Sequence, residues 1–325
     1  MVRYIIRRLI YSIPVLIIAS ILVFIVMKKA ADPTAALRAN PRITAQDIAN
    51  LRKALGLDKS GIQQYLTWFT NFLKGNWGIS VISQQSVFEQ IRVALLNSAI
   101  LGITATVFSL IIGVSIGVYS SLHQYSKLDN TFTTAAFVGI SMPNFWFALL
   151  LQLFFGVYMV KWFNLRDPIF AIAGNITPGE TGLQLVDRAR HIVLPALVLA
   201  VQIIAVYSRY MRASMLEVLH SDYLRTARAK GLRERRVVFR HAMRNALIPI
   251  TTQLALDVGA IAAGLIITEQ IFQWPGMGPL FLTAVGNGDL PLALAWVMVT
   301  VFAVIIFNLI ADIMYAVLDP RIRYA

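Results

Sequence analysis

Six long apolar segments run through the 325-residue chain and restrict it to the folds of membrane proteins. Hydrophobic residues make up 58% of the sequence and charged residues only 14%, whereas soluble domains carry about 25% charged residues. A segment of about 20 apolar residues can cross a bilayer as a helix, which satisfies its backbone hydrogen bonds internally. We therefore predict an all-α, polytopic membrane helix bundle with six transmembrane helices. The predicted spans lie near Leu9–Met27, Val93–Ser120, Ala135–Val160, Ile192–Tyr210, Leu247–Ile271 and Leu292–Val317.

The distribution of basic residues predicts how this bundle is oriented. The loop Arg209–Arg244 contains ten Lys or Arg residues against three acidic ones, and smaller basic clusters lie near both ends of the chain. The loop after the third span holds four basic residues, and the loop after the fifth holds none. Because short cytoplasmic loops carry an excess of Lys and Arg, we predict that both termini and loop 209–244 are cytoplasmic.

The spans divide the chain into three predicted parts. Residues 1–28 form an N-terminal tail and a first span, which is retained because Lys28 and Lys29 stand where a signal peptide would have small residues. Residues 29–92 form an extracytoplasmic amphipathic loop, with helical periodicity at Ile48–Leu55 and at Ile62–Leu73, the latter ending before Gly75. This loop is either a packed cap or a docking surface for an external partner. Residues 93–325 form a five-helix core with the cytoplasmic loop 209–244.

Several chemical functions are excluded by missing motifs. The chain has no G-x-x-x-x-G-K-[ST] sequence, so it does not bind ATP through a P-loop. It has no cysteine, and its four histidines are scattered, so we predict no metal site, no cofactor of its own and no catalytic residue. The basic residues are explained by topology, so nucleic acid is not an expected partner.

Two acidic residues in the fifth span need a separate explanation. A charge at the middle of a bilayer costs about 2.5–3.5 kcal/mol on insertion scales. Asp257 lies near the middle of that span and should face protein or water, and Glu269 lies near its outer end. Either Asp257 couples transport to a proton or cation, or it is a polar pore-lining or inter-helix residue. The second interpretation is favoured because proton relays need several such groups.

Small residues and prolines predict where helices touch and begin. Gly113-x-x-x-Gly117 and Ala260-x-x-x-Gly264 would let helix backbones approach closely. Prolines at 143, 195 and 249 are expected at the starts of spans three, four and five, where a missing N–H costs least.

The cytoplasmic loop has helical features of its own. Ser221 is expected to cap a short helix that runs from Asp222 to Lys230 and stops at Gly231. A second helix is predicted from near Glu234 towards Pro249. Apolar residues at helical spacing among the arginines indicate a protein interface, because a loop that only sets topology does not need them.

These residues carry a family resemblance. The string Asp222-Tyr223-Leu224-Arg225-Thr226-Ala227-Arg228-Ala229-Lys230-Gly231-Leu232, followed by Arg240–Pro249, resembles the EAA loop of ABC importer permeases of the dipeptide, oligopeptide and nickel branch. Ser141–Trp146 and Glu269–Gly278 resemble two further signatures of that branch, and Tyr4–Leu9, Leu55–Asp58 and Gly75–Gly78 match the type with a long first outer loop. Two stretches depart from the usual pattern. Arg225-Thr226-Ala227 replaces Glu-Ala-Ala, and Gly288-Asp289-Leu290-Pro291 replaces Arg-Asp-Tyr-Pro.

The resemblance implies one of two membrane subunits of a prokaryotic importer in the cell inner membrane. Its implied partners are a second permease, two ATPase subunits that bind ATP and Mg, and an extracytoplasmic substrate-binding protein. Residues implied to couple to an ATPase are Asp222, Tyr223, Arg225, Thr226, Ala227, Ala229, Lys230, Gly231 and Leu232. Residues implied to support the loop are His241, Arg244, Asn245 and Pro249. Pathway candidates are Asp257, Glu269, Ser141 and Pro143, and the outer-loop signature is Trp274, Pro275 and Gly276.

The sequence leaves the substrate open. Permeases of this branch imply a di- or oligopeptide, with nickel, haem or glutathione as alternatives. A different class of function, a secondary transporter coupled to protons through Asp257, would work without any ATPase subunit. An ATPase and a binding protein encoded next to this chain would distinguish the two classes.

Overall fold

The computed structural model describes residues 2–30, 58–179 and 184–318, together with the single positions 44, 46, 50 and 53. Over these residues the chain is helical, and its only β pairing is an isolated bridge between Ile79 and Ser86. The helices at the outer ends of the chain and in the first loop are α1 (Val2–Ala30), α4 (Gly61–Leu73) and α16 (Leu290–Leu318). The central helices are α5 (Val87–Leu122), α6 (Lys127–Ser141), α7 (Asn144–Leu153), the π-helical η1 (Phe154–Tyr158), α8 (Met159–Trp162) and α9 (Gln184–Leu219). They are followed by α10 (Asp222–Ala229), α11 (Glu234–Arg236), the π-helical η2 (Val237–Ala242), α12 (Met243–Ala246), α13 (Ile248–Ile261), α14 (Ile266–Ile271) and α15 (Met277–Gly286).

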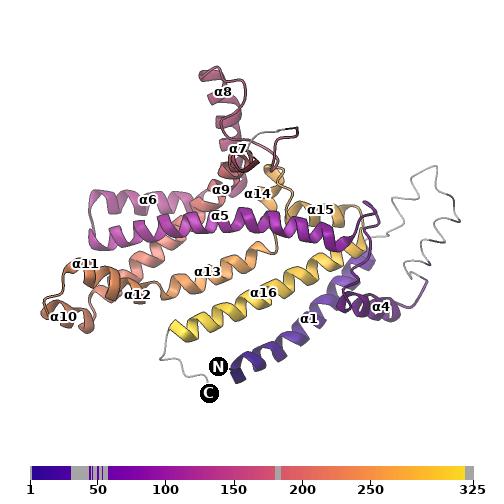
Figure 1. The fold of residues 1–325 in the computed structure, drawn as a ribbon, viewed down its shortest axis with the longest axis horizontal. Helices are drawn as coiled ribbons and strands as arrows, with labels where there is room; N and C mark the ends of the chain where they lie inside the picture. Colours follow the sequence, from indigo (N-terminus) through magenta and orange to yellow (C-terminus); the bar gives the residue numbers. More distant parts are fainter. Residues whose placement is uncertain are drawn as a thin grey trace.

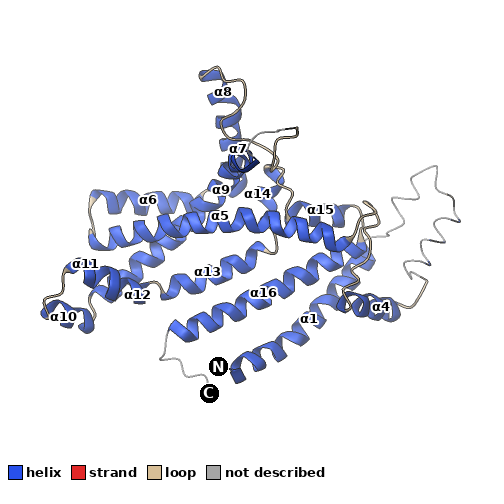
Figure 2. Ribbon diagram, in the orientation of Figure 1, coloured by secondary structure: helices blue, strands red, loops and turns tan. Residues whose placement is uncertain are grey.

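The long helices form a bundle along the longest axis of the molecule (Figures 1 and 2). Helix α5 packs on α9, and α13 packs between them and α16, which in turn contacts α1. Helices α10–α12 lie at one end, α4 and α15 lie at the other, and α7 with α8 projects sideways (Figure 1). The Val2 end of α1 and the Leu318 end of α16 point towards the end that carries α10. The side of the membrane that this end faces stays a prediction.

Among the residues that the structure describes, five helical stretches are long and apolar enough to cross a membrane: Ile10–Lys29, Val87–Leu122, Asn144–Trp162, Gln184–Leu219 and Leu290–Met314. They confirm a polytopic all-α bundle, although two of the predicted spans are interrupted. The predicted span Ala135–Val160 breaks after Ser141, because Pro143 disfavours a helical conformation at Met142, whose backbone is extended (φ −80°, ψ 121°).

The predicted fifth span, Leu247–Ile271, is also divided. Helix α13 ends at Ile261 and α14 begins at Ile266, with Gly264 between them at φ +80°. Glycine adopts this backbone conformation at little energetic cost, and the conformation ends the helix. A single helix was therefore the wrong prediction here, and the total of six crossings stays a prediction. Pro249 lies in the first turn of α13 as expected, whereas Pro195 lies inside α9 and not at its start.

Close packing of α5 on α9 confirms one of the two small-residue motifs. A Cβ atom added at Gly113 would lie only 2.8 Å from the Cβ of Tyr207, and one added at Gly117 would overlap the Cβ of Met211. The second motif, Ala260-x-x-x-Gly264, was misread, because Gly264 lies in the turn after α13 and not on a helix surface.

Helix α4 confirms the periodicity at Ile62–Leu73. Its first turn is a capping box between Ser60 and Gln63, and Gly75 follows its end at φ +82°. Helix α4 packs on α1, where the hydroxyls of Tyr65 and Ser20 are 2.8 Å apart and the rings of Tyr65 and Phe24 meet edge to face. This face of α4 is therefore a packed cap. The other predicted helix, Ile48–Leu55, lies almost wholly outside the described residues.

Candidate functional site

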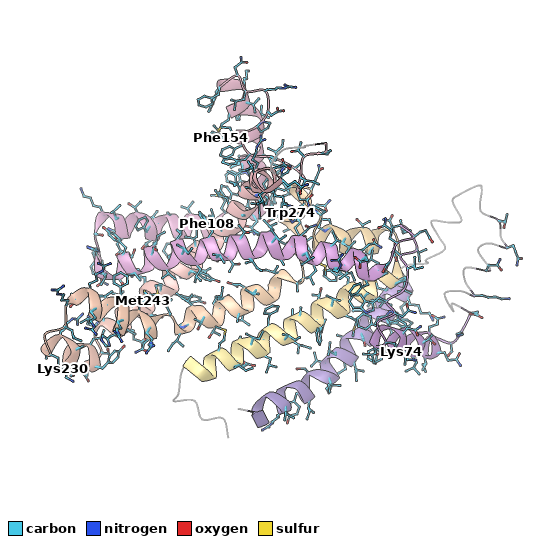
Figure 3. All side chains as sticks on the ribbon, viewed as in Figure 1. Lys74, Phe108, Phe154, Lys230, Met243 and Trp274 are labelled. Carbon is cyan, nitrogen blue, oxygen red and sulfur yellow. The ribbon has the colours of Figure 1, made fainter. Side chains whose placement is uncertain are left out.

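Helix α10 lies at the end of the bundle opposite α4, as the labels Lys230 and Lys74 show in Figure 3. It begins after Ser221, whose backbone is extended as at an N-cap (φ −71°, ψ 148°). The Ser221 hydroxyl does not cap the helix as predicted, because it donates to the carbonyl of Val218 at 2.6 Å. Gly231 follows the helix at φ +77°, a left-handed conformation that favours glycine and ends the helix where the sequence predicted.

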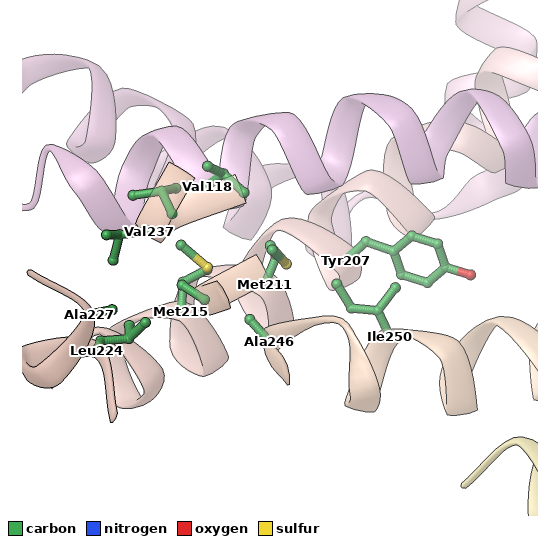
Figure 4. Packing of buried hydrophobic residues seen from close by; sticks show 11 residues of the cluster. Val118, Tyr207, Met211, Met215, Leu224, Ala227, Val237, Ala246 and Ile250 are labelled. Atoms are coloured by element: carbon green, nitrogen blue, oxygen red, sulfur yellow. The ribbon is translucent and has the colours of Figure 1, made fainter. Parts of the chain in front are cut away.

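Helix α10 is attached to the bundle by two apolar side chains. Leu224 is fully buried and Ala227 is 9% exposed. Both join an apolar cluster that draws on α5, α9, α10, η2, α12 and α13 (Figure 4). The cluster consists of Val118, Tyr207, Met211, Met215, Leu224, Ala227, Val237, Val238, Ala242, Ala246 and Ile250. Ala227 was predicted to couple to an ATPase; its burial makes it an anchor of α10 to the bundle, and its coupling role stays a prediction.

The remaining predicted coupling residues divide between two environments. Leu232 is half-buried and packs against the same apolar cluster, so it also supports the loop from within. The others are exposed: Asp222, Tyr223, Arg225, Thr226, Ala229, Lys230 and Gly231. Arg225 Nη1 lies 3.3 Å from the Asp222 carboxylate on this surface, and both side chains are mostly in solvent. The exposed face of α10 is thus polar and open to a partner.

The segment after α10 forms the predicted second helix, with one irregularity. Residues Glu234–Ala246 are helical throughout, but Val237–Ala242 adopt a π-helical turn between α11 and α12. Such turns are rare and frequently mark functional sites. The predicted supporting residues lie along this helix and at the start of α13. His241 is half-buried, and Arg244, Asn245 and Pro249 are exposed.

Two polar contacts tie α10 to this second helix. Asn245 Nδ2 donates to the Tyr223 hydroxyl at 2.7 Å and so joins α12 to α10. The Arg228 guanidinium donates to the Glu234 carboxylate, with the shortest N–O distance at 2.8 Å. The Arg228 hydrogen bonds lower the pKa of Glu234, and the Glu234 carboxylate raises the pKa of Arg228.

The structure adds an ion pair that the sequence analysis missed. Asp129, near the start of α6, pairs with Arg212 on α9 through two N–O contacts of 2.9 Å each. Hydrogen bonds from Arg212 hold the pKa of Asp129 below its ordinary value. The two residues are 83 positions apart. The only sequence signal for either of them is that a charged residue lies at the edge of an apolar segment.

Asp257 joins two helices of the bundle. Its carboxylate accepts a hydrogen bond of 2.7 Å from the Tyr207 hydroxyl on α9 and one of 2.8 Å from Gln253 Nε2 on its own helix. Asp257 is half-buried. This geometry fits the favoured interpretation of an inter-helix residue, and a role in proton coupling stays a prediction.

Glu269 does not line an open pathway surface, contrary to the prediction. Its side chain is fully buried, and it accepts hydrogen bonds from the Ser98 hydroxyl at 2.5 Å and from the Gly278 backbone N–H at 2.7 Å. A Cβ atom at Gly276 would lie 2.5 Å from the Glu269 carboxyl carbon, so the outer-loop signature leaves room only for glycine here. Glu269 therefore holds the outer loop in shape.

The outer-loop signature forms one hydrogen-bonded unit with α5. Trp274 Nε1 donates to the Asn97 carbonyl at 3.0 Å, and Asn97 Nδ2 donates to the Pro275 carbonyl at 2.9 Å. Figure 3 shows Trp274 where α14 approaches α5. This reciprocal pair fixes the segment Trp274–Gly276 to α5.

The other two pathway candidates lie at the break between α6 and α7. Ser141 is the last residue of α6, and Pro143 precedes α7; both are exposed. Gln202 Nε2 on α9 donates to the carbonyl of Met142 at 3.1 Å and so satisfies a backbone group that the break leaves free. Among the residues that the structure describes, no three His, Asp or Glu side chains come together as a metal site requires.

Comparison with known proteins decides the family. A family described as "Binding-protein-dependent transport system inner membrane component" matches residues 109–324, and the N-terminal component of such systems matches residues 1–88. The chain belongs to this family. It is a permease subunit of a bacterial transport system and a multi-pass protein of the inner membrane, and it works with other components of that system.

Relatives match the chain along its whole length. The oligopeptide transport system permease protein AppB of Bacillus subtilis is 39% identical over 325 residues, covering 100% of both chains. The dipeptide transport system permease protein DppB of Escherichia coli K12 is 36% identical, covering 100% of this chain and 99% of that protein. The glutathione transport system permease protein GsiC of Salmonella choleraesuis is 35% identical, with 100% of both chains covered.

Proposed function

We propose that this chain forms half of the translocation pathway of an ATP-driven importer for di- or oligopeptides. The names of AppB and DppB support peptides as the substrate class, and GsiC keeps glutathione, itself a small peptide, as the alternative. The observation that carries the proposal is the construction of α10. It presents an exposed polar face to a partner and is anchored to the bundle by Leu224 and Ala227.

The exposed face of α10 is the proposed contact with an ATPase subunit. Two such subunits would bind ATP and Mg, because this chain has no P-loop. Only His220 and Ser221 separate the end of α9 from the start of α10, so a displacement of α10 acts directly on a helix that crosses the bundle. The buried side of α10 passes the same displacement to η2 and α13. ATP binding would thereby shift the population between inward- and outward-facing states.

A second, related permease would complete the pathway, and a substrate-binding protein would dock at the opposite end of the bundle. That end carries α4, α15 and the hydrogen-bonded segment Trp274–Gly276 (Figure 1). A fixed outer loop supplies a constant surface on which a soluble protein can dock.

Reconstitution tests the proposal. The chain is purified with the permease, the ATPases and the binding protein encoded beside it, and uptake of a labelled dipeptide and of a labelled pentapeptide is measured in liposomes. Uptake should require ATP, the ATPases and the loaded binding protein. Uptake driven by a proton gradient without ATPases, and lost in Asp257→Asn, would establish the secondary transporter instead. A binding protein that retains nickel or haem but no peptide would overturn the substrate class.

A further inference from the structure

A buried ion pair joins α6 to α9 at the α10 end of the bundle. The Nε and Nη2 atoms of Arg212 each lie 2.9 Å from a different carboxylate oxygen of Asp129. The backbone N–H of Tyr125 adds a third hydrogen bond to that carboxylate, also at 2.9 Å. The Asp129 side chain is only 1% exposed and that of Arg212 is 27% exposed. Paired N–H donors of a guanidinium fix the direction of the contact as well as its distance.

Helix α6 is held to α9 at two further places along its length. The Arg209 guanidinium lies 5.0 Å from the centre of the Phe137 ring, within the range of a cation–π contact. Beyond the last residue of α6, Gln202 on α9 binds the carbonyl of Met142. Helix α6 therefore contacts α9 from its first turn to the break that precedes α7.

This attachment places α6 in line with the proposed coupling site. Helix α9 leads into α10 across two residues, so the movement of α10 reaches α9 first. We propose that Asp129 and Arg212 are positioning residues that make α6 follow α9, and so carry the movement of α10 to the break at Met142–Pro143. The inference rests on the proposed function, because it assumes that an ATPase displaces α10.

The chemistry of the contact suits this task. An apolar contact between two helices has no direction and allows them to slide, whereas a bidentate ion pair has one geometry and leaves a buried charge if it is broken. A second route for the movement runs from α10 through η2 and α12 to α13, by apolar packing and the Asn245–Tyr223 hydrogen bond, and it does not include the ion pair. Loss of the ion pair should therefore uncouple α6 while α13 still responds. Spatial connection by itself does not establish such a route, so the test has to measure coupling.

The first experiment measures peptide uptake per ATP hydrolysed by the complete transporter in liposomes. Asp129→Asn removes the charge and keeps the shape, and Arg212→Lys keeps the charge and removes the bidentate fork. Asp167→Asn makes the same carboxylate-to-amide change at an exposed position and is the matched control. We expect both pair variants to hydrolyse ATP at the wild-type rate, with uptake per ATP at least about fivefold lower, in the range of typical coupling energies. Asp167→Asn should keep the wild-type ratio.

The second experiment measures the movement directly and does not depend on a variant of the ion pair. Because the sequence has no cysteine, spin labels can be placed by Lys127→Cys on α6, Glu217→Cys on α9 and Leu256→Cys on α13, all exposed positions. Between the nucleotide-free and ATP-trapped states, the 127–217 distance should stay constant and the 127–256 distance should change. In Asp129→Asn the 127–217 distance should change as well.

Three results would contradict the inference. Wild-type uptake per ATP in a folded Asp129→Asn transporter would show that the pair carries no movement. A 127–217 distance that changes in the wild type would show the same even if neither pair variant assembles. A wild-type complex without any ATP-driven uptake would refute the proposed function itself, and with it the movement that this ion pair is inferred to carry.

Discussion

Leu224→Ala tests the claim that α10 acts through the bundle and not only through its exposed face. The Leu224 side chain is fully buried in the apolar cluster under α10. The change removes three buried carbons at about 0.8 kcal/mol each and leaves a cavity. Substitutions of this kind cost about 2–5 kcal/mol in total. Helix α10 has only 8 residues, and isolated helices shorter than about 12–15 residues are marginal in water, so most of this cost falls on its attachment.

Hydrogen exchange of the α10 backbone amides measures that attachment. A loss of about 2–4 kcal/mol corresponds to exchange that is roughly 30-fold to 1000-fold faster, at 1.4 kcal/mol for each factor of ten. Mass spectrometry of the segment 220–232 in the assembled transporter reports the change, and uptake per ATP should fall with it. Leu66→Ala is the matched control, because Leu66 is 52% exposed on α4 at the opposite end. Wild-type exchange in the Leu224→Ala protein would refute the anchoring role.

Three further predictions concern other parts of the chain. Gly117→Leu should prevent the close approach of α5 to α9 and lower the melting temperature of the purified subunit, whereas Gly286→Leu, at a position with open space around it, should change it little. Glu269→Gln replaces one of two acceptor oxygens by an NH2 group that faces an N–H or O–H donor, at a cost of about 1–3 kcal/mol. Proteolysis of the segment Trp274–Gly276 should become faster, and an unchanged rate of proteolysis would show that the hydrogen bonds of Glu269 are dispensable. The pKa of Glu234 is lowered in the folded protein, so its pairing with Arg228 contributes stability above the ordinary value of 4.5, and this contribution disappears as the pH falls through the lowered value. The protection factor of the α10 amides, which is the intrinsic exchange rate at each pH divided by the observed rate, should therefore fall at acidic pH in the wild type and change less in Glu234→Gln.

The sequence predicted the parts of this structure that depend on local chemistry. The lengths of the apolar segments predicted the positions of α1, α5 and α16, and Gly231 predicted the end of α10. The two interrupted spans were harder to predict. Proline, as at Pro143, is also common at helix starts, and glycine, as at Gly264, is also common where helices pack closely. Local sequence cannot tell a break from those alternatives when the residues on both sides are equally apolar.

Contacts between distant residues were beyond sequence reasoning. Asp129 and Arg212 are far apart in the chain, and nothing in their neighbourhood identifies either as the other's partner. Ala227 belongs to the string that resembles a coupling motif, but the motif does not say which of its residues face inward. Glu269 was assigned to the pathway because it is an acid in an apolar segment; its donors, Ser98 and Gly278, come together only in the folded chain.

The attachment of α10 differs from that of the segment Trp274–Gly276, and this difference bears on how movement can occur. At the end that carries α4, Glu269 and Trp274 are fixed by directional hydrogen bonds to α5 and to the loop itself. At the other end, α10 rests on apolar side chains that include Met211 and Met215, and methionine adapts readily to a changed packing shape. The shortest polar contacts of α10 with other helices run to Glu234 and Asn245 on the helical segment that follows it, so both can move together while the apolar side chains beneath them repack. Because the same displacement would cost several hydrogen bonds at the α4 end, we expect the segment Trp274–Gly276 to stay fixed while the α10 end moves.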